Sequence, residues 1–553
     1  MTAVGHGVGR RRRRISARKR DSSKSGHAVR GFRDTCPKGC HALDSPRAMN
    51  LFENRPFKTR NAEEFELNQV LDLFVDPAEG ARNPFEFENV IVKGRQGSGK
   101  TMYLRANLAY HSYSIVPSLL GGQPPTLPVL LRLSDFQHIR NPEEIYREVV
   151  ISIVDELANS FLQLLNAQRV AQLHLGMQSL PANLLDVGKI AAARRALVLL
   201  RADEYEETIT RELGTTAAIK CKPIELAGKL KTEGVLGVKK KAKPGVADIR
   251  DAFNFLLGNS GGSILLLIDE AGQLDESFFR TNAGSSLFET LMNQLRTQEY
   301  IRTKIAVYPH SYSDTLTETR YGDLLLLTDP IRSDVGYKRF RGKTLNIIQN
   351  YLSVSAGEPT VASQIFDTDG SPDGVGDCLE QIIYGSDGNI RRLMLILDLA
   401  MEIAHAEHGG KGRVTIANAF GALVRQSEAM EILFSEEELG FLEDVVKLCK
   451  SRSCYKFQFP KMTPLLTKYC EKSNEHNILK VNEIGTGRRP TTYEFDYAFC
   501  IHRDIPTHCI PGTERVDKNR SFQTGAWITR KTNISKDLAA RAKPVAKQEG
   551  VNV

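Results

Sequence analysis

The sequence has no run of about 18 consecutive apolar residues, so we do not expect it to span a membrane. Its nine cysteines are scattered over 553 residues, are odd in number and form no pair of CxxC units. This usage favours a protein of the reducing cytoplasm. Cys36, Cys40 and His41 supply only one half of a zinc site, and we interpret them as ordinary loop residues.

The net positive charge of the chain comes from its N-terminal tail. The chain has a net charge of +8, but residues 1–48 carry +10, which leaves −2 for the other 505 residues. The segment "RRRRRISARKR", from Arg10, has no apolar stretch after it, so it is neither a secretory nor a twin-arginine signal. It is either a disordered basic arm that contacts nucleic acid or a dispensable extension ahead of a folded protein that begins near Met49. We favour the second interpretation.

Apolar runs of strand length alternate with helical patterns over much of the chain. The runs are Val90–Val92, Val129–Leu133, Ile264–Ile268, Ile305–Tyr308 and Leu324–Leu327. Such alternation predicts a parallel sheet in an α/β fold. About 130 residues separate the second run from the third, far more than one crossover needs, so we expect an insertion there.

Two local patterns beside these runs carry further predictions. The stretch "NAEEFELNQVLDLF" predicts a helix capped by Asn61 ahead of the first strand. Residues 220–243 contain eight lysines and two glutamates, which predicts an exposed or disordered segment. Its lysines either contact a nucleic-acid backbone or keep the segment solvated, and we favour solvation.

The stretch "NVIVKGRQGSGKT", residues 89–101, matches the P-loop pattern GxxxxGK[ST] in full. An apolar strand before it and a helical pattern after it supply the context that the pattern requires. Backbone N–H groups would face the phosphates of ATP, Lys100 would contact the β and γ oxygens, and Thr101 would bind Mg²⁺. The predicted nucleotide-binding residues are Gly94, Arg95, Gln96, Gly97, Ser98, Gly99, Lys100 and Thr101.

The second half of such a site is acidic. The stretch "GSILLLIDEAGQL" ends an apolar run in Asp269 and Glu270. We expect Asp269 to hold Mg²⁺ through its water shell and Glu270 to act as general base on the attacking water. The alternative is that both carboxylates only cap the following helix, and the complete P-loop argues against it.

The order of motifs resembles a known family of ATPases. The sequence has no guanine-reading NKxD motif, and the adjacent Asp269 and Glu270 resemble the AAA+ class. "GNIRRLMLILDLA", from Gly388, starts an amphipathic helix, and its Gly-x-x-Arg resembles the second sensor of origin-recognition-type AAA+ initiators. The resemblance covers about residues 50–430 and implies an AAA+ type parallel sheet with a helical lid. It also implies that Arg391, or its neighbour Arg392, touches the γ-phosphate. Two surface arginines on a helix are the alternative.

One part of the family pattern is missing. Its first sensor is usually a polar residue such as Asn at the end of the fourth strand, where this sequence offers Tyr308, His310 and Ser311. The arginine finger of a neighbouring subunit has only Arg296 and Arg302 as candidates. The same motifs occur in the related STAND ATPases, which act in signalling.

The C-terminal part resembles the winged-helix α+β domain that initiator-type ATPases carry after the lid. "FSEEELGFLEDVVKLCK" and "PKMTPLLTKYCEK" predict two helices, and "NILKVNEIGTGRRPTTYEFDYAF" predicts two strands joined by a Gly-rich turn. The resemblance implies DNA contacts near the hairpin tip, which carries Arg488 and Arg489. A docking module for another protein is the alternative.

The predicted organisation starts with a disordered basic extension over residues 1–48. It continues with an ATPase core over 49–330 that has an insertion at about 168–262, a helical lid over 331–432, a winged-helix-like domain over 433–535 and a tail over 536–553.

We expect a cytoplasmic ATPase that couples its nucleotide state to assembly on DNA or a partner protein, as a homo- or hetero-oligomer through the ATPase core. The insertion and the unusual first sensor fit a specialised prokaryotic branch, such as an antiphage or mobile-element ATPase. The alternative is a nucleotide-gated, STAND-like regulator or scaffold that hydrolyses little ATP and acts through protein contacts.

Overall fold

The computed structural model describes most of the chain from Leu51 onward. The described residues are 51–80, 82–121, 123–175, 194, 197, 201, 204–209, 236–241, 244–257, 262–269, 274, 276–279, 286–308, 322–329, 331, 334–368, 377–459, 463–470, 476–486, 489–506, 531–534 and 538. The basic extension and the half zinc site therefore lie outside the described residues.

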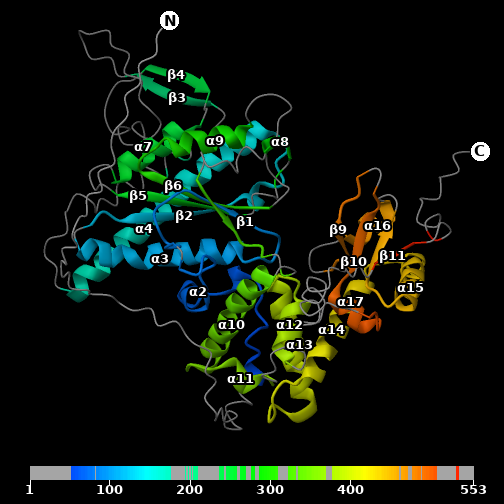
Figure 1. Ribbon diagram of the computed structural model, residues 1–553. Helices are drawn as coiled ribbons and strands as arrows, with labels where there is room; N and C mark the ends of the chain where they lie inside the picture. Colours follow the sequence, from blue (N-terminus) through cyan, green and yellow to red (C-terminus); the bar gives the residue numbers. More distant parts are fainter. Residues whose placement is uncertain are drawn as a thin grey trace, which may run out of the picture. The chain divides into compact units, whose positions relative to one another are not determined.

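Five parallel strands form the larger sheet, in the order β2-β5-β6-β1-β7 (Figure 1). The predicted parallel α/β sheet is confirmed, although β2 and β6 begin three and four residues earlier than the apolar runs suggested. The strands are β1 (Val90–Lys93), β2 (Thr126–Arg132), β5 (Ser263–Asp269), β6 (Ile301–Val307) and β7 (Asp323–Leu326).

Helices cover both faces of this sheet, which is why the central strand β5 is apolar at successive positions. Alternate residues of β5 point to opposite faces. Leu265 and Leu267 pack in one cluster with Leu104 of α3 (Lys100–Leu120). Leu266 and Ile268 belong to the other cluster, together with apolar side chains of α4 (Pro142–Leu175), α7 (Val246–Leu257) and α9 (Leu287–Arg296).

The stretch between β2 and β5, where the sequence predicted an insertion, contains helices and a strand pair. It begins with η2 (Leu133–Phe136) and includes α4, α7 and an antiparallel pair, β3 (Glu204–Ile209) and β4 (Leu236–Lys241). The lysines at 239–241 lie in β4, and the register places Lys239 and Lys241 opposite Glu206 and Glu204. Residues 236–241 of the lysine-rich segment thus form a strand; the rest of that segment lies outside the described residues, and its exposure stays a prediction.

The segment ahead of β1 is not the single capped helix that the sequence predicted. It forms a 3₁₀ turn, η1 (Ala62–Glu64), and a separate helix, α2 (Leu67–Leu73), with extended backbone at Phe65 and Glu66 between them. Asn61 donates to the Glu64 carboxylate rather than capping the backbone. Arg105 of α3 donates a 2.5 Å hydrogen bond to the Phe65 carbonyl, so a tertiary contact satisfies a group that a continuous helix would have used.

A mainly helical unit follows the sheet. Its helices are α10 (Asp334–Ala356), α11 (Ala362–Ile365), α12 (Cys378–Gly385), α13 (Ile390–His408) and α14 (Ile416–Glu431). Helix α13 begins at the Asn389 cap, whose side chain accepts from the Arg392 N–H, and ends at Gly409, which has a left-handed φ of 61°. The predicted amphipathic helix after Gly388 is therefore present.

The C-terminal part builds a second sheet, in the order β11-β8-β10-β9. Both predicted helices and the predicted hairpin are present as α15, α16 and the antiparallel pair β9 and β10. The short elements β8, α17 and β11 were not predicted. The bounds are α15 (Glu436–Ser451), β8 (Lys456–Phe459), α16 (Pro464–Cys470), β9 (Leu479–Glu483), β10 (Thr491–Phe495), α17 (Tyr497–His502) and β11 (Lys531–Asn533).

One hydrophobic cluster joins the helical unit to the C-terminal sheet. It runs from the lid helices into β8, β10 and α17 without interruption. Leu51, Phe52, Phe57 and Leu73, from before the P-loop, are buried in the same cluster. The larger sheet has its own two clusters, one on each face. The first and last parts of the described chain thus share one core, and the larger sheet forms another body.

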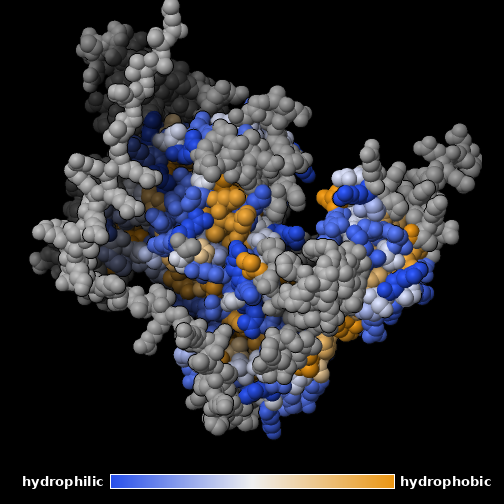
Figure 2. All heavy atoms as spheres, in the orientation of Figure 1, coloured by the Kyte–Doolittle hydropathy of each residue, from blue (hydrophilic) through white to orange (hydrophobic). Residues whose placement is uncertain are grey.

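Within the described residues, no helix combines the length and the apolar character needed to cross a membrane. Figure 2 shows hydrophobic side chains in separate groups among hydrophilic ones on one face. The exposed large apolar residues are likewise spread over several elements, with Leu326 on β7 and Ile484 after β9 among them.

Candidate functional site

The predicted P-loop lies where three neighbouring strands end. It leaves β1 at Gly94, whose N–H donates to the Val307 carbonyl at the end of β6, at 3.2 Å. The next N–H, of Arg95, donates to the Thr328 hydroxyl just after β7, at 3.3 Å. Because the strands are parallel, their carboxyl ends meet at one edge, and the loop is anchored to both neighbours there before α3 begins.

Two glycines of the loop have backbone conformations that other residues rarely adopt. Gly97 has φ = 75° and Gly99 has φ = 92°. At Gly97 a Cβ would also lie 2.3 Å from the Asn389 side-chain oxygen, and at Gly94 it would lie 2.2 Å from the Ser98 hydroxyl. Gly97 and Gly99 therefore allow the turn of the loop, and Gly94 and Gly97 leave room for the side chains that lie against them.

Lys100 is buried at the start of α3. Its Nζ donates to the carbonyls of Gly94 and Arg95, both at 2.9 Å, and lies 3.9 Å from the centre of the Tyr308 ring. Burial lowers the pKa of Lys100 to about 8; Asp269 opposes the shift and Arg391 adds to it. The ammonium is thus held by neutral groups and lacks full charge compensation, which suits it to bind an anion.

The acidic residue of the site lies at the end of β5, the strand next to β6. Asp269 is the last residue of β5, and its side chain is buried. Glu270, the predicted general base, lies outside the described residues. Thr101, the predicted Mg²⁺ ligand, follows Lys100 at the start of α3 and lines the same pocket.

The pocket beside the P-loop is built from four parts of the chain. Its walls come from the loop itself, from the segment before β1, from the ends of β6 and β7, and from α10 and α13. The lining residues include Arg60, Glu63, Leu73, Phe74, Val75, Pro77, Gln96, Gly97, Ser98, Gly99, Lys100, Thr101, Tyr308, Leu327, Lys343, Ile347, Tyr351, Ile390, Arg391 and Met394. Apolar and aromatic side chains on one side and the P-loop on the other give it the makeup of a site for a base with phosphates.

The two arginines that the sequence left as alternatives have different surroundings. Arg391 lines the pocket. Arg392 is fully buried and donates two hydrogen bonds to Asp496, at 2.9 and 2.6 Å. The geometry therefore favours Arg391 as the arginine that faces a bound nucleotide.

The start of α13 contacts the P-loop directly, which sequence reasoning missed. The N–H groups of Ile390 and Arg391 donate to the Gly97 carbonyl at 2.9 and 3.3 Å. The Asn389 side chain donates to the Gln96 carbonyl at 3.1 Å. The only local signal was an asparagine in the cap position of a predicted helix, which does not identify a partner almost 300 residues earlier.

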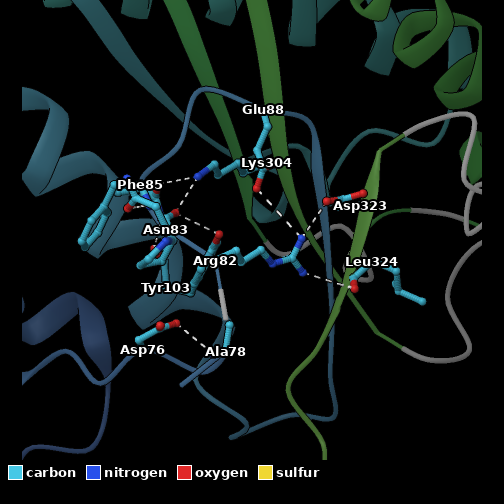
Figure 3. A network of polar contacts seen from close by, with 12 residues as sticks. Asp76, Ala78, Arg82, Asn83, Phe85, Glu88, Tyr103, Lys304, Asp323 and Leu324 are labelled. Carbon is cyan, nitrogen blue, oxygen red and sulfur yellow. Dashed lines mark hydrogen bonds and ion pairs between the residues drawn. The ribbon is translucent and has the colours of Figure 1, made fainter. Parts of the chain in front are cut away.

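A polar cluster near the amino end of β1 holds the segment that leads into this strand (Figure 3). Lys304 of β6 is fully buried and donates to the Pro84 carbonyl and to Asn107, at 2.7 and 2.8 Å. Burial lowers its pKa to about 8, and Glu88 opposes the shift. Arg82 binds Asp323 of the edge strand β7 at 2.9 Å. These contacts fix residues 82–88 across the sheet without entering the pocket.

Comparison with known proteins supports the sequence-based resemblance over part of the chain. Residues 55–115 match the family model described as ORC-CDC6-like. This stretch runs from the segment before α2 through the P-loop and into α3, so the predicted resemblance to origin-recognition-type ATPases is confirmed there. No curated protein matches the sequence.

Two solved structures show a weak overall likeness. The ORC2 protein of Aeropyrum pernix, solved as ADPNP and ADP complexes, is 11% identical, with a TM-score of 0.34 over 84% of this chain and 98% of that one. Drosophila ORC bound to DNA is also 11% identical, with a TM-score of 0.30 over 87% and 97% of the two chains. Similarity at this level carries no property over to this chain.

The residues of the site fit a nucleoside triphosphate with its metal. Gly97 and Gly99 shape a loop at the start of a long helix, where N–H groups lack intrahelical partners. The buried Ser98 hydroxyl makes no hydrogen bond within the described residues. Thr101 and Asp269 supply the hydroxyl and carboxylate oxygens that Mg²⁺ prefers.

Proposed function

We propose that this protein binds ATP with Mg²⁺ in the pocket beside the P-loop and hydrolyses it. The observation that carries the proposal is the meeting of Lys100, Arg391 and the P-loop backbone around one pocket, with Asp269 close enough to oppose the lowering of the Lys100 pKa by burial. Lys100 and the loop N–H groups would bind the phosphates, and Thr101 and Asp269 would hold the metal. Bound Mg²⁺ would neutralise phosphate charge.

The remaining roles follow from the chain's own groups. Glu270 would accept a proton from the attacking water, and Arg391 would face the developing negative charge from the opposite side of the pocket. Phe74, Val75 and Tyr351 line the apolar side, where a base would be shielded from water. The ORC-CDC6-like match over residues 55–115 supports the same assignment.

Two substitutions separate binding from hydrolysis. Lys100→Ala should abolish binding of a fluorescent ATP analogue, since the lysine contributes charge to phosphate in the ground state. Glu270→Gln should bind the analogue like the parent but release no phosphate, because the base acts chiefly in the transition state. Lys58→Ala, at an exposed lysine outside the pocket, is the matched control. Parental hydrolysis by both site variants would show that the assignment is wrong.

We propose further that nucleotide state governs assembly on DNA or a partner protein. Two helices followed by the hairpin of β9 and β10 support a winged-helix interpretation of residues 433–535; Arg489 lies between these strands, and Arg488 lies outside the described residues. The long insertion and the unusual first sensor support a specialised branch, such as prokaryotic defence or mobile-element biology; of the three candidates for that sensor, His310 and Ser311 lie outside the described residues.

A second candidate function is a nucleotide-gated, STAND-like regulator that hydrolyses little ATP. The favouring observation is again Tyr308, whose ring faces Lys100 at the position where the related ATPases usually have a polar sensor. Phosphate release by the parent distinguishes the two functions: steady turnover supports the ATPase, and tight binding with negligible release supports the regulator.

A further inference from the structure

The turn between α12 and α13 contacts two distant parts of the chain. On one side, Asn389 donates to the Gln96 carbonyl and the Ile390 N–H donates to the Gly97 carbonyl. On the other side, Asp387 accepts from Lys480 of β9 at 2.9 Å. Six consecutive residues, 387–392, therefore join the P-loop to the C-terminal sheet.

A buried ion cluster forms the second of these links. Asp496 is fully buried and binds Arg392 at 2.6 Å and Lys480 at 2.8 Å. Burial alone would raise the pKa of Asp496, but the charges of Arg392 and Lys480 outweigh it and hold that pKa well below its usual range. The same carboxylate caps α17 by accepting from the Ala498 N–H at 2.9 Å. Asp496 thus ties the first turn of α13 to β9, β10 and α17.

Asn389 forms the link to the P-loop with both ends of its amide. Its oxygen accepts from the Arg392 N–H at 3.0 Å and caps α13, while its nitrogen donates to Gln96. Gly97 has no room for a side chain because Asn389 occupies that space. Arg391 lies between Asn389 and Arg392 in the same turn. Its position is consequently set by the P-loop on one side and by Asp496 on the other.

We propose that Asn389 is a positioning residue of the nucleotide site and that residues 387–392 transmit nucleotide occupancy to the C-terminal sheet through Asp496. The inference rests on the proposed nucleotide binding. A nucleotide that restricts the motion of the P-loop and Arg391 would also restrict residues 387–392, and with them the ion pairs of Arg392 and Lys480 with Asp496. Coupling of this kind is reciprocal, so a change at Asp496 must alter nucleotide affinity in turn.

Asn389→Ser is the sharpest test of the first half. Serine keeps a cap for α13 but cannot reach Gln96 as a donor, so only the contact with the P-loop is lost. We expect the affinity for a fluorescent ATP analogue to fall about two- to tenfold, the range for one hydrogen bond, while the melting temperature stays close to that of the parent. A residue with a merely structural role would change the melting temperature and leave the affinity unchanged.

Hydrogen–deuterium exchange tests the second half. In the parent, ATP with Mg²⁺ should slow exchange in β9, β10 and α17 as well as in the P-loop. Asp496→Asn keeps the shape and the cap but removes the charge, and it should weaken analogue binding and abolish the nucleotide-dependent protection of the C-terminal elements. Because this variant can lose stability, the protection seen in the parent and the Asn389→Ser titration each test the proposal without it.

Glu402→Gln is the matched control, since Glu402 lies further along α13 and binds Arg425 of α14 at 3.2 Å, and neither residue lines the pocket. It should leave affinity and protection as in the parent. Parental affinity in Asn389→Ser and no nucleotide-dependent protection of β9, β10 and α17 would overturn the coupling while nucleotide binding stands. A parent that binds no analogue would overturn the proposed function and the coupling with it.

Discussion

The ammonium of Lys100 lies 3.9 Å from the centre of the Tyr308 ring, at the end of the strand next to the P-loop. The ring supplies a negative face to a cation that is otherwise held by two carbonyls. Tyr308 therefore contributes to the charge state of the residue that should meet the phosphates. This contact leads to a prediction on the pH dependence of nucleotide binding.

We expect affinity for the fluorescent ATP analogue to fall as pH rises above about 8 in the parent. Lys100 has a pKa of about 8 and must be charged to bind phosphate, so binding above that pH requires the uptake of a proton. Tyr308→Phe keeps the ring and should give the same profile. Tyr308→Leu removes the cation–π contact, so its affinity should begin to fall at lower pH. Superimposable profiles for all three proteins would contradict this role of the ring.

The neighbouring arginines should separate binding from stability. Arg391→Ala should weaken analogue binding with little change in melting temperature, because Arg391 lines the pocket. Arg392→Ala leaves Asp496 buried with only Lys480 opposite and should cost about 3 kcal/mol of unfolding free energy. Denaturant titration and analogue binding, measured on both variants, check the assignment. An unstable Arg391→Ala with parental affinity would reverse it.

Truncation should define where the fold begins. Removal of residues 1–48 should leave the melting temperature and ATPase activity unchanged, as expected for a segment without helical or strand periodicity. Removal of residues 1–57 should destabilise the protein strongly, since it deletes Leu51, Phe52 and Phe57 from the core. The single substitution Phe57→Ala should already cost about 3–5 kcal/mol. A large loss of stability on the shorter truncation would make the extension part of the core.

The buried lysine behind the P-loop should give stability a recognisable pH dependence. Lys304 has a pKa of about 8 in the folded protein and 10.5 as a free side chain. Between these values the unfolded chain binds more protons, so the contribution of Lys304 to stability increases as pH rises from about 8 to 10.5.

Lys304→Met lacks this titrating group. The unfolding free energy of the parent should therefore increase relative to that of the variant as the pH rises from about 8 to 10.5. Urea unfolding at several pH values measures the difference. The exposed Lys447→Met is the control and should run parallel to the parent. A constant gap between the parent and Lys304→Met would contradict the prediction.

Arg488 and Arg489 should contribute to duplex DNA binding if the winged-helix proposal holds. In a chain without residues 1–48, replacing both by Ala should weaken DNA binding without changing ATP affinity. It should also flatten the slope of log K against log salt by about two units, because two phosphate contacts are lost. Replacement of Lys411 and Arg425, exposed on the helical unit, removes the same charge as a control. No DNA affinity of the parent at low salt would favour a protein-docking role.

The larger sheet and the P-loop could be read from the sequence because both depend on local patterns. Strands buried on two faces are short apolar runs, and the loop's glycines are required by its own turn. The break at Phe65 could not be predicted, since it depends on Arg105 in another helix. The choice between Arg391 and Arg392 was also hidden: a helix places neighbouring residues on different faces, but only tertiary packing decides which face meets the P-loop.

Within the described residues, the chain passes between the core of the larger sheet and the core shared by the first and last segments at residues 73–74 and 327–331, and Met102 of α3 also packs against the shared core. Leu73 belongs to the shared core and Phe74 packs with the sheet, while Leu327 belongs to the sheet and Ile331 to the shared core. Leu73, Phe74 and Leu327 all line the pocket beside the P-loop. The pocket is therefore lined by residues of both cores, and a molecule bound in it would contact both.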